Sequence, residues 1–105
     1  MFHSTHVFTG ETIYRRPAQS YTEFTDELNR LQTLQQTFTQ SSIIERTALL
    51  QQFADSLSQN QERLAEMVCE EVGRCLHECR AEISKSIELI RYYVRLAPEL
   101  LAHKT

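Results

Sequence analysis

Residues 69–79, CEEVGRCLHEC, decide how the second half of this chain folds. They hold all three cysteines, one of the four histidines and one of the two glycines of the chain. Gly73 stands where a helix would end in a left-handed residue, a conformation that glycine adopts without a Cβ penalty. The stretch is therefore predicted to end one helix at Gly73 and to begin a longer one near Cys75.

The same stretch supplies the residue types of a structural zinc site, which uses four cysteine and histidine ligands. Cys75 and Cys79 are four residues apart, so they share a helix face, about 40° from each other. His77 lies about 200° around the axis from Cys75, so one ion cannot bind all three while the segment is helical. The other histidines lie near the chain ends (His3, His6 and His103). We therefore predict packing roles, with Cys79 in the core and Cys69 and Cys75 at least partly buried.

The composition limits the class of protein. The 105 residues make one domain at most, and a net charge of −3 without a basic run argues against nucleic-acid binding. No apolar stretch approaches the roughly 20 residues of a membrane span, and the N-terminus lacks the pattern of a signal peptide. Three cysteines without a secretion signal indicate reduced thiols and a cytoplasmic protein.

The N-terminal part is predicted to form a short hairpin or an extended arm. Strand character is confined to residues 7–16, where Thr9-Gly10-Glu11 is a turn signal and Thr12-Ile13-Tyr14 is rich in β-branched and aromatic residues. Pro17 ends any strand pairing. We divide the chain into an arm or hairpin at 1–19 and a helical segment at 20–105.

Two amphipathic helices are predicted next. The first runs from Tyr21 to about Thr39, is capped by Ser20 or Thr22, and carries apolar residues at helical spacing (Phe24, Leu28, Leu31, Leu34 and Phe38). The second opens at Ser42, where Glu45 completes a capping box. Its expected buried stripe follows the same spacing (Ile43, Leu50, Phe53, Ala54 and Leu57). Ile44 and Leu49 are expected at the edges of this stripe.

Two more helices complete a mainly α fold. Asn60 is the expected N-cap of the third, whose apolar residues are Leu64, Met67, Val68 and Val72. The fourth is the longest and carries a continuous stripe (Leu76, Cys79, Ile83, Ile87, Ile90 and Val94). Pro98 is expected to bend or terminate it. A second apolar face on this helix predicts a homo-oligomer (Leu89, Tyr92, Tyr93 and Leu96).

No chemistry-bearing motif points to an active site. Cys75 near a helix start could be a thiol nucleophile, but His77 points away from it and no base or oxyanion site is evident. Glu70-Glu71 could shuttle protons, but such a pair is more typical of a solvated helix face. Arg15-Arg16 could attract an anion, but a solvated pair at a strand end is the more common case. Tyr92 and Tyr93 could stack a ligand, although core or interface packing is their more common role. The sequence contains no glycine-rich phosphate loop.

The ordered series of helical motifs resembles the N-terminal helices of the aldehyde dehydrogenase superfamily, over residues 7–102. The matching pieces are Glu45-Arg46, LLQQFADSL at 49–57, RLAEMVCEEVGR at 63–74 and AEISKSIELIRYY at 81–93. Thr9-Gly10-Glu11 looks like the turn between the family's first strands, and the Phe24–Phe38 helix matches the one that follows. The closing RYY and APELL look most like the succinate-semialdehyde dehydrogenase-like branch.

The resemblance implies the N-terminal part of an α/β cofactor-binding domain. The family's enzymes oxidise aldehydes to carboxylates with NAD or NADP, using a catalytic cysteine and a base glutamate that lie beyond the matched segment. None of Cys69, Cys75 or Cys79 matches the catalytic position, so no catalytic, cofactor-binding or metal residue is assigned. Gly73-Arg74-Cys75 departs from the family's glycine-lysine-proline, and the tryptophan usual soon after Phe38 is absent.

The leading hypothesis is therefore an N-terminal fragment or truncated form of an NAD(P)-dependent aldehyde dehydrogenase. The chain alone would be inert and would hold no cofactor, and its helices would pack on the sheet of the parent's cofactor-binding domain. The alternative is a stand-alone helical interaction or oligomerisation module. An enzyme in its own right is a third class, which no motif favours.

Overall fold

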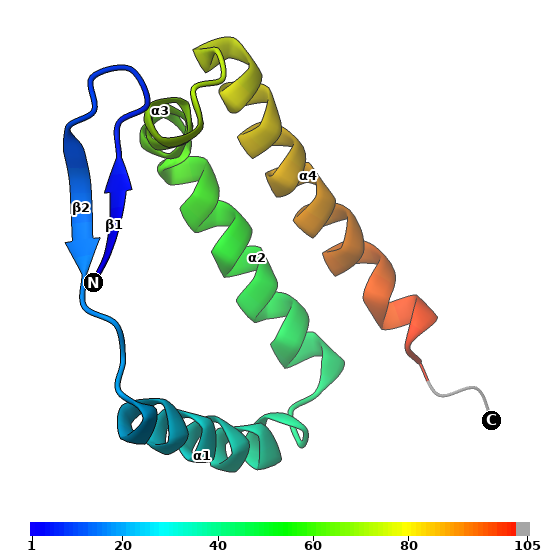
Figure 1. Ribbon diagram of the computed structural model, residues 1–105. Helices are drawn as coiled ribbons and strands as arrows, with labels where there is room; N and C mark the ends of the chain where they lie inside the picture. Colours follow the sequence, from blue (N-terminus) through cyan, green and yellow to red (C-terminus); the bar gives the residue numbers. More distant parts are fainter. Residues whose placement is uncertain (103–105) are drawn as a thin grey trace.

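A computed structural model describes residues 1–102, and Figure 1 shows a two-stranded hairpin followed by four helices. The expected order of elements is confirmed, with the last helix the longest. The strands β1 and β2 are Phe2–Thr5 and Thr12–Arg16. The helices α1 to α4 are Tyr21–Phe38, Ile43–Gln59, Gln61–Val72 and Leu76–Leu100. No helix in the described range is long and apolar enough to cross a membrane.

The hairpin pairs β1 and β2 antiparallel, with an irregularity between Ser4 and Thr5. The predicted turn is confirmed: Gly10 has a φ of 75°, and its N–H donates to the His6 carbonyl at 2.9 Å. β2 ends directly before Pro17, also as expected. Confining strand character to residues 7–16 was wrong, because β1 precedes that range. Its mostly polar residues give no strand signal, and pairing with β2 makes it a strand.

The helix α1 begins with a complete capping box. The Ser20 hydroxyl accepts a hydrogen bond from the Glu23 N–H at 3.1 Å, and the Ser20 N–H donates to the Glu23 carboxylate at 2.9 Å. The amphipathic stripe is present, but no residue of this helix is buried. Its apolar side chains remain about half exposed (Phe24, Leu28, Leu31, Leu34 and Phe38). In Figure 1, α1 joins the hairpin to α2 and lies apart from the other helices.

The helix α2 confirms its capping box, since the Ser42 hydroxyl accepts from the Glu45 N–H at 3.1 Å. The expected buried stripe is only partly correct. Ala54 is buried, but Leu50 is 47% exposed and Phe53 is 53% exposed. One residue step turns a helix by about 100°, so Phe53 lies well around the axis from Ala54. The side of α2 that packs is set by where α4 lies, which the local sequence does not specify.

The junction between α2 and α3 centres on Asn60, which is both the C-cap of α2 and the N-cap of α3. Its position as N-cap of α3 is confirmed, but its side chain makes no bond to α3. Instead the Asn60 amide donates to the Ser56 carbonyl of α2 at 2.8 Å. The side chain therefore completes the end of α2, and α3 starts at Gln61 without a side-chain cap.

The helix α4 confirms its predicted stripe. Cys79 and Ile87 are buried, and the other members are half-buried (Leu76, Ile83, Ile90 and Val94). Pro98 was expected to bend or terminate this helix, yet it lies inside α4, which continues to Leu100. Because Pro98 lies two residues before the end of α4, the loss of its N–H donor does not stop the helix. The helix ends with the Leu101 N–H donating to the Ala97 carbonyl at 2.9 Å.

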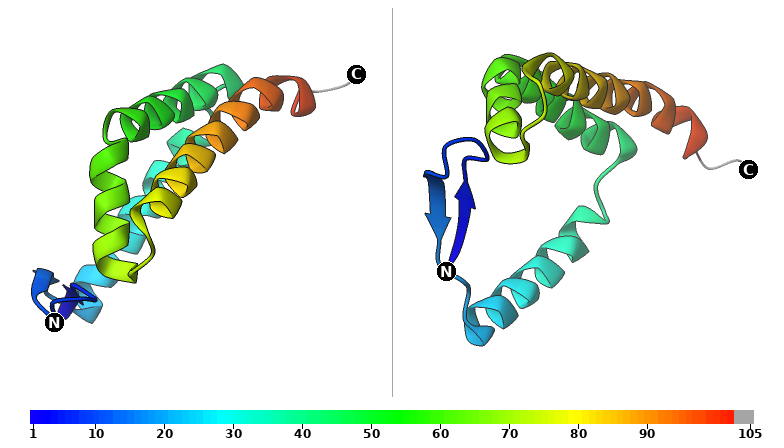
Figure 2. Two further views of the ribbon diagram at one scale, coloured as in Figure 1. Left: turned by 90° about the horizontal axis from the view of Figure 1, so that it is seen from above. Right: turned by 45° about the horizontal axis from the view of Figure 1, so that its top comes forward.

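The core lies where α4 packs along α2 and against α3, as both views in Figure 2 show. It is small, because its buried apolar members are mostly short side chains (Ala54, Ala65, Cys79 and Ile87). Thr47 is also buried, and its hydroxyl donates to the Ile43 and Ile44 carbonyls. The hairpin is attached at its loop, where the Val7 N–H donates to the Glu70 carbonyl of α3 at 3.0 Å.

Candidate functional site

The turn at Gly73 joins α3 to α4 and positions the whole cysteine-rich stretch. Gly73 has a φ of 83° and its N–H donates to the Cys69 carbonyl at 2.9 Å, so the predicted left-handed helix end is confirmed. The hairpin loop packs directly on this turn. A Cβ added to Gly73 would lie 3.0 Å from Cγ2 of Val7. Glycine is therefore required by both the backbone conformation and the close approach of the hairpin.

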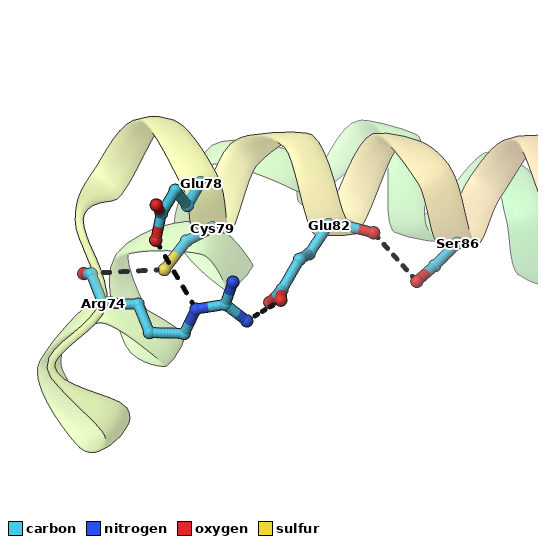
Figure 3. Close-up of polar contacts among 5 residues, drawn as sticks. All are labelled: Arg74, Glu78, Cys79, Glu82 and Ser86. Atoms are coloured by element: carbon cyan, nitrogen blue, oxygen red, sulfur yellow. Dashed lines mark hydrogen bonds and ion pairs between the residues drawn. The ribbon is translucent and has the colours of Figure 1, made fainter.

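Cys79 is the core residue that the sequence predicts. It is 0% exposed, and its thiol donates to the Arg74 carbonyl at 3.8 Å (Figure 3). Burial raises the pKa of this thiol, and the nearby Cys69 raises it further. The thiol is therefore held in the neutral form, which is a poor nucleophile and a poor metal ligand.

The other two cysteines have different surroundings. Cys69 is half-buried, as expected, but Cys75 is exposed, so the expectation of its burial was wrong. Cys75 is the N-cap of α4 with an extended backbone, and its side chain makes no capping hydrogen bond. An N-cap residue stands at the solvent edge of its helix, where the first turn leaves N–H groups uncovered.

A cluster of charged side chains surrounds the start of α4, as Figure 3 shows. Arg74 forms ion pairs with Glu82 and, at 3.6 Å, with Glu78. The Ser86 hydroxyl donates to the Glu82 carbonyl at 3.0 Å. The single guanidinium of Arg74 thus pairs with both carboxylates. These ion pairs connect the turn at Gly73 to the first two turns of α4.

The residues of the candidate metal and thiol sites do not converge. Across residues 1–102, no three His, Cys, Asp or Glu side chains lie together as a group that could hold a metal ion. His77 is exposed on α4, His3 and His6 belong to the hairpin, and His103 lies outside the described residues. The ring nitrogen Nδ1 of His6 instead accepts hydrogen bonds from the N–H groups of Phe8 and Thr9.

Neither glycine offers a phosphate site for a dinucleotide. Such a site needs free backbone N–H groups in a glycine-rich turn at a helix N-terminus. The Gly10 N–H is used by the His6 carbonyl, and the Gly73 N–H by the Cys69 carbonyl. These are the only two glycines in the chain. The residues present therefore do not fit the phosphates of NAD or NADP.

Two of the open depressions on the surface of the described chain involve residues that were considered from the sequence. One, at the base of the hairpin, has Arg16 over the Tyr14 ring at 5.9 Å and is completed by four neighbours (Phe2, Pro17, Ala18 and Gln19). The other lies on the outer side of α4 (Lys85, Glu88, Leu89, Tyr92 and Arg95). Tyr92 and Tyr93 pack edge to face there, with ring centroids 5.2 Å apart. Both tyrosines are about half exposed, which suits an interface rather than a core.

Arg46 has a structural role that the sequence did not predict. Arg46 donates to the carbonyls of Phe38 and Thr39 at 3.2 and 3.0 Å and to the Ser41 hydroxyl at 3.0 Å. It thereby caps the C-terminal end of α1 from the first turn of α2. Its guanidinium also lies 5.0 Å from the centroid of the Phe38 ring. The only sequence signal was its place beside Glu45, four residues after the capping Ser42.

These features define the fold class before they define a family: a short two-stranded hairpin followed by four helices. The fold matches a solved structure, the succinic semialdehyde dehydrogenase from Streptococcus pyogenes in complex with NADP+, with a TM-score of 0.88 and 22% identity. The match covers 100% of this chain and 24% of that chain. The fold is thus that of one segment of an aldehyde dehydrogenase.

The sequence comparisons identify the family. The model of the aldehyde dehydrogenase family matches residues 1–105, and the chain belongs to this family. The succinate-semialdehyde dehydrogenase (NADP+) of Deinococcus radiodurans is 25% identical over 99% of this chain and 22% of its own length. A protein named as a probable enzyme of the same kind in Synechocystis is 30% identical over 90% of the chain and 21% of its own length.

The chain therefore spans about a quarter or less of these relatives and matches the N-terminal portion of an aldehyde dehydrogenase. The resemblance inferred from the helical motifs is confirmed, including its succinate-semialdehyde dehydrogenase-like character. Nothing in the comparisons supports the alternative of a stand-alone interaction module.

Proposed function

We propose that the chain is the N-terminal scaffold of an NADP-dependent enzyme that oxidises succinate semialdehyde to the carboxylate. The observation that carries this proposal is the family match over the whole chain, together with relatives that are named for this substrate and cofactor. The catalytic cysteine, the base and the nucleotide site would belong to the rest of the parent. On this proposal the 105 residues alone are catalytically inert.

The exposed apolar surface supports a scaffolding role. The stripe of α1 and the outward side chains of α2, Leu50 and Phe53, are about half exposed. Faces of this kind are stabilised when another element covers them, because burial of apolar surface is favourable by about 25 cal/mol per Å². In the parent, the covering element would be the sheet of the cofactor-binding domain. The hairpin at 1–19 and the helical segment at 20–105 would both be parts of that domain.

The proposal is tested by the reading frame downstream of residue 105 in the source DNA. We expect it to encode a glycine-rich turn, a catalytic cysteine and a base glutamate. The protein expressed with that extension should form NADPH from NADP+ when succinate semialdehyde is added, with NAD+ as the comparison cofactor. An extension without these residues, or one that folds but shows no aldehyde-dependent reduction of either cofactor, would overturn the proposal.

The location and the association state of the chain are part of the same proposal. The odd number of cysteines, all free in the structure, supports a cytoplasmic protein with reduced thiols. The exposed face of α4 with Leu89, Tyr92, Tyr93 and Leu96 supports a homo-oligomer. Sedimentation velocity over a hundredfold range of concentration should show a rising mean mass. A constant monomer mass over that range would contradict self-association.

A further inference from the structure

The outer side of α4 carries apolar residues and residues of both charges, so two copies of this surface can complement each other. We call this surface the outer face, and it consists of seven residues at helical spacing (Lys85, Glu88, Leu89, Tyr92, Arg95, Leu96 and Glu99). All are exposed except the half-buried Leu96. Tyr92 lies at the midpoint, seven residues from each end of the set. The outer face includes every residue that lines the depression on this helix.

The outer face has an apolar edge and a charged edge. At about 100° per residue, Leu89 and Leu96 lie about 60° and 40° to one side of Tyr92. Glu88 and Arg95 lie at about the same angles on the other side, and Lys85 and Glu99 lie within about 20° of the midline. A two-fold axis perpendicular to the plane that contains a helix pair exchanges the two helices, reverses their direction and keeps the lateral sides. Leucines would then meet leucines along one edge, and charges would meet charges along the other.

We infer that a second copy of this chain binds the outer face of α4, with the two helices antiparallel about a two-fold axis at Tyr92. Lys85 of one copy is then level with Glu99 of the other, since each is seven residues from Tyr92. Glu88 and Arg95, four residues before and three after, are level within one residue, or about 1.5 Å. Leu89 and Leu96 are level within the same offset. Each level pair combines opposite charges or two apolar side chains.

The charges on this face are available for such pairing. Within the described residues, none of the four charged side chains of the outer face takes part in an ion pair. The other arginines of α4 are already matched inside the chain: Arg80 pairs with Glu62 at 2.6 Å, and Arg91 with Asp55 at 3.2 Å. In the antiparallel pair, four intermolecular ion pairs form symmetrically around the two tyrosines. A parallel pair would instead place each charge beside its own copy.

Charge reversal tests the pairing. Glu88→Arg and Arg95→Glu should each raise the dissociation constant in sedimentation equilibrium about tenfold, because symmetry makes each substitution act at two pairs. The double swap, Glu88→Arg with Arg95→Glu, should return the constant to within about threefold of the original. Asp26→Arg, an equal charge change on exposed α1, is the matched control and should leave it unchanged. Failure of the double swap to restore association would overturn the inference.

Cross-linking tests the register independently, in a Cys69→Ser and Cys75→Ser background. Tyr92→Cys should give a disulfide-linked dimer on mild oxidation, because the two copies of this position meet at the axis. Lys85→Cys alone should not, since its two copies lie fourteen residues apart along the helices, about 21 Å. Mixing Lys85→Cys with Glu99→Cys chains should give the mixed dimer. Cross-linking of Lys85→Cys with itself would overturn the antiparallel arrangement.

This inference deepens the proposed self-association, and the two can fail separately. If the chain forms dimers but the charge swap or the register test fails, self-association is supported and this interface is rejected. In that case the half-exposed stripe of α1 would be the next surface to test. A strictly monomeric chain overturns both, while the proposed place of the chain in a parent enzyme is judged by the downstream reading frame alone.

Discussion

Gly73 shows how one residue joins the two halves of the molecule. Its left-handed backbone ends α3, and the missing side chain lets Val7 of the hairpin loop approach. The first requirement was readable from the sequence, because glycine at a helix end is a local signal. The second was not, because Val7 and Gly73 meet only after the chain has folded. The exposure of Cys75 was missed for a similar reason, since it depends on what covers the helix start.

Substitution of Gly73 by alanine should destabilise the chain more than the same substitution at Gly10. Both glycines have positive φ values, for which alanine costs about 1–2 kcal/mol. Only at Gly73 would the new Cβ also press on Val7, at 3.0 Å, whereas nothing lies within 4 Å of it at Gly10. Urea unfolding measures the difference. The excess cost at Gly73 should shrink in a Val7→Ala background, and equal costs for the two glycines would contradict the packing argument.

The buried thiol of Cys79 should make stability fall at alkaline pH. Burial raises its pKa above the ordinary 9.0, so on raising the pH the unfolded chain loses this proton before the folded chain does. The free energy of unfolding therefore decreases as the pH rises above about 9. Between pH 7.5 and pH 10, urea unfolding curves should show a larger decrease in the free energy of unfolding for the natural chain than for Cys79→Ala. An identical decrease in both would show that the thiol titrates alike in the two states.

At the scale of elements, the helices divide into those that pack and one that does not. The capping box of Ser42 and Glu45, the helix order and the stripe of α4 follow from local patterns, which is why the sequence predicts them well. The buried side of α2 does not follow from such patterns, because Leu50 and Phe53 are as apolar as the residues that α4 covers. The stripe of α1 is likewise correct as a helix signal, yet none of its residues is buried in this chain.

The two capping serines should therefore respond differently to replacement by alanine. Each substitution removes a side-chain cap worth about 1 kcal/mol to its helix. Ser42→Ala should lower the global free energy of unfolding by about that amount, because α2 belongs to the core. Ser20→Ala should instead raise amide hydrogen exchange within residues 21–38 and leave the urea midpoint nearly unchanged. A shift of the midpoint by Ser20→Ala equal to that of Ser42→Ala would mean that α1 folds with the core.

For the whole molecule, the central feature is the contrast between a well-formed fold and an apolar surface that remains about half exposed. The chain reproduces a segment of an aldehyde dehydrogenase at a TM-score of 0.88, over about a quarter of the solved neighbour. Large apolar side chains on α1, α2 and α4 stay about half exposed. The sequence could identify the family because its helical motifs are local and ordered. It could not show which faces remain open, since exposure depends on how the helices pack against one another in the folded chain.

An aldehyde-dependent assay of the purified 105-residue chain tests the central claim most directly. The chain is mixed with succinate semialdehyde and NADP+, and absorbance at the NADPH band is followed at a protein concentration where the fold is confirmed by circular dichroism. We predict no rate above the protein-free blank, because the described residues provide neither a nucleotide phosphate site nor an activated thiol. Aldehyde-dependent NADPH formation that persists through repurification and is lost on Cys75→Ser would contradict the account.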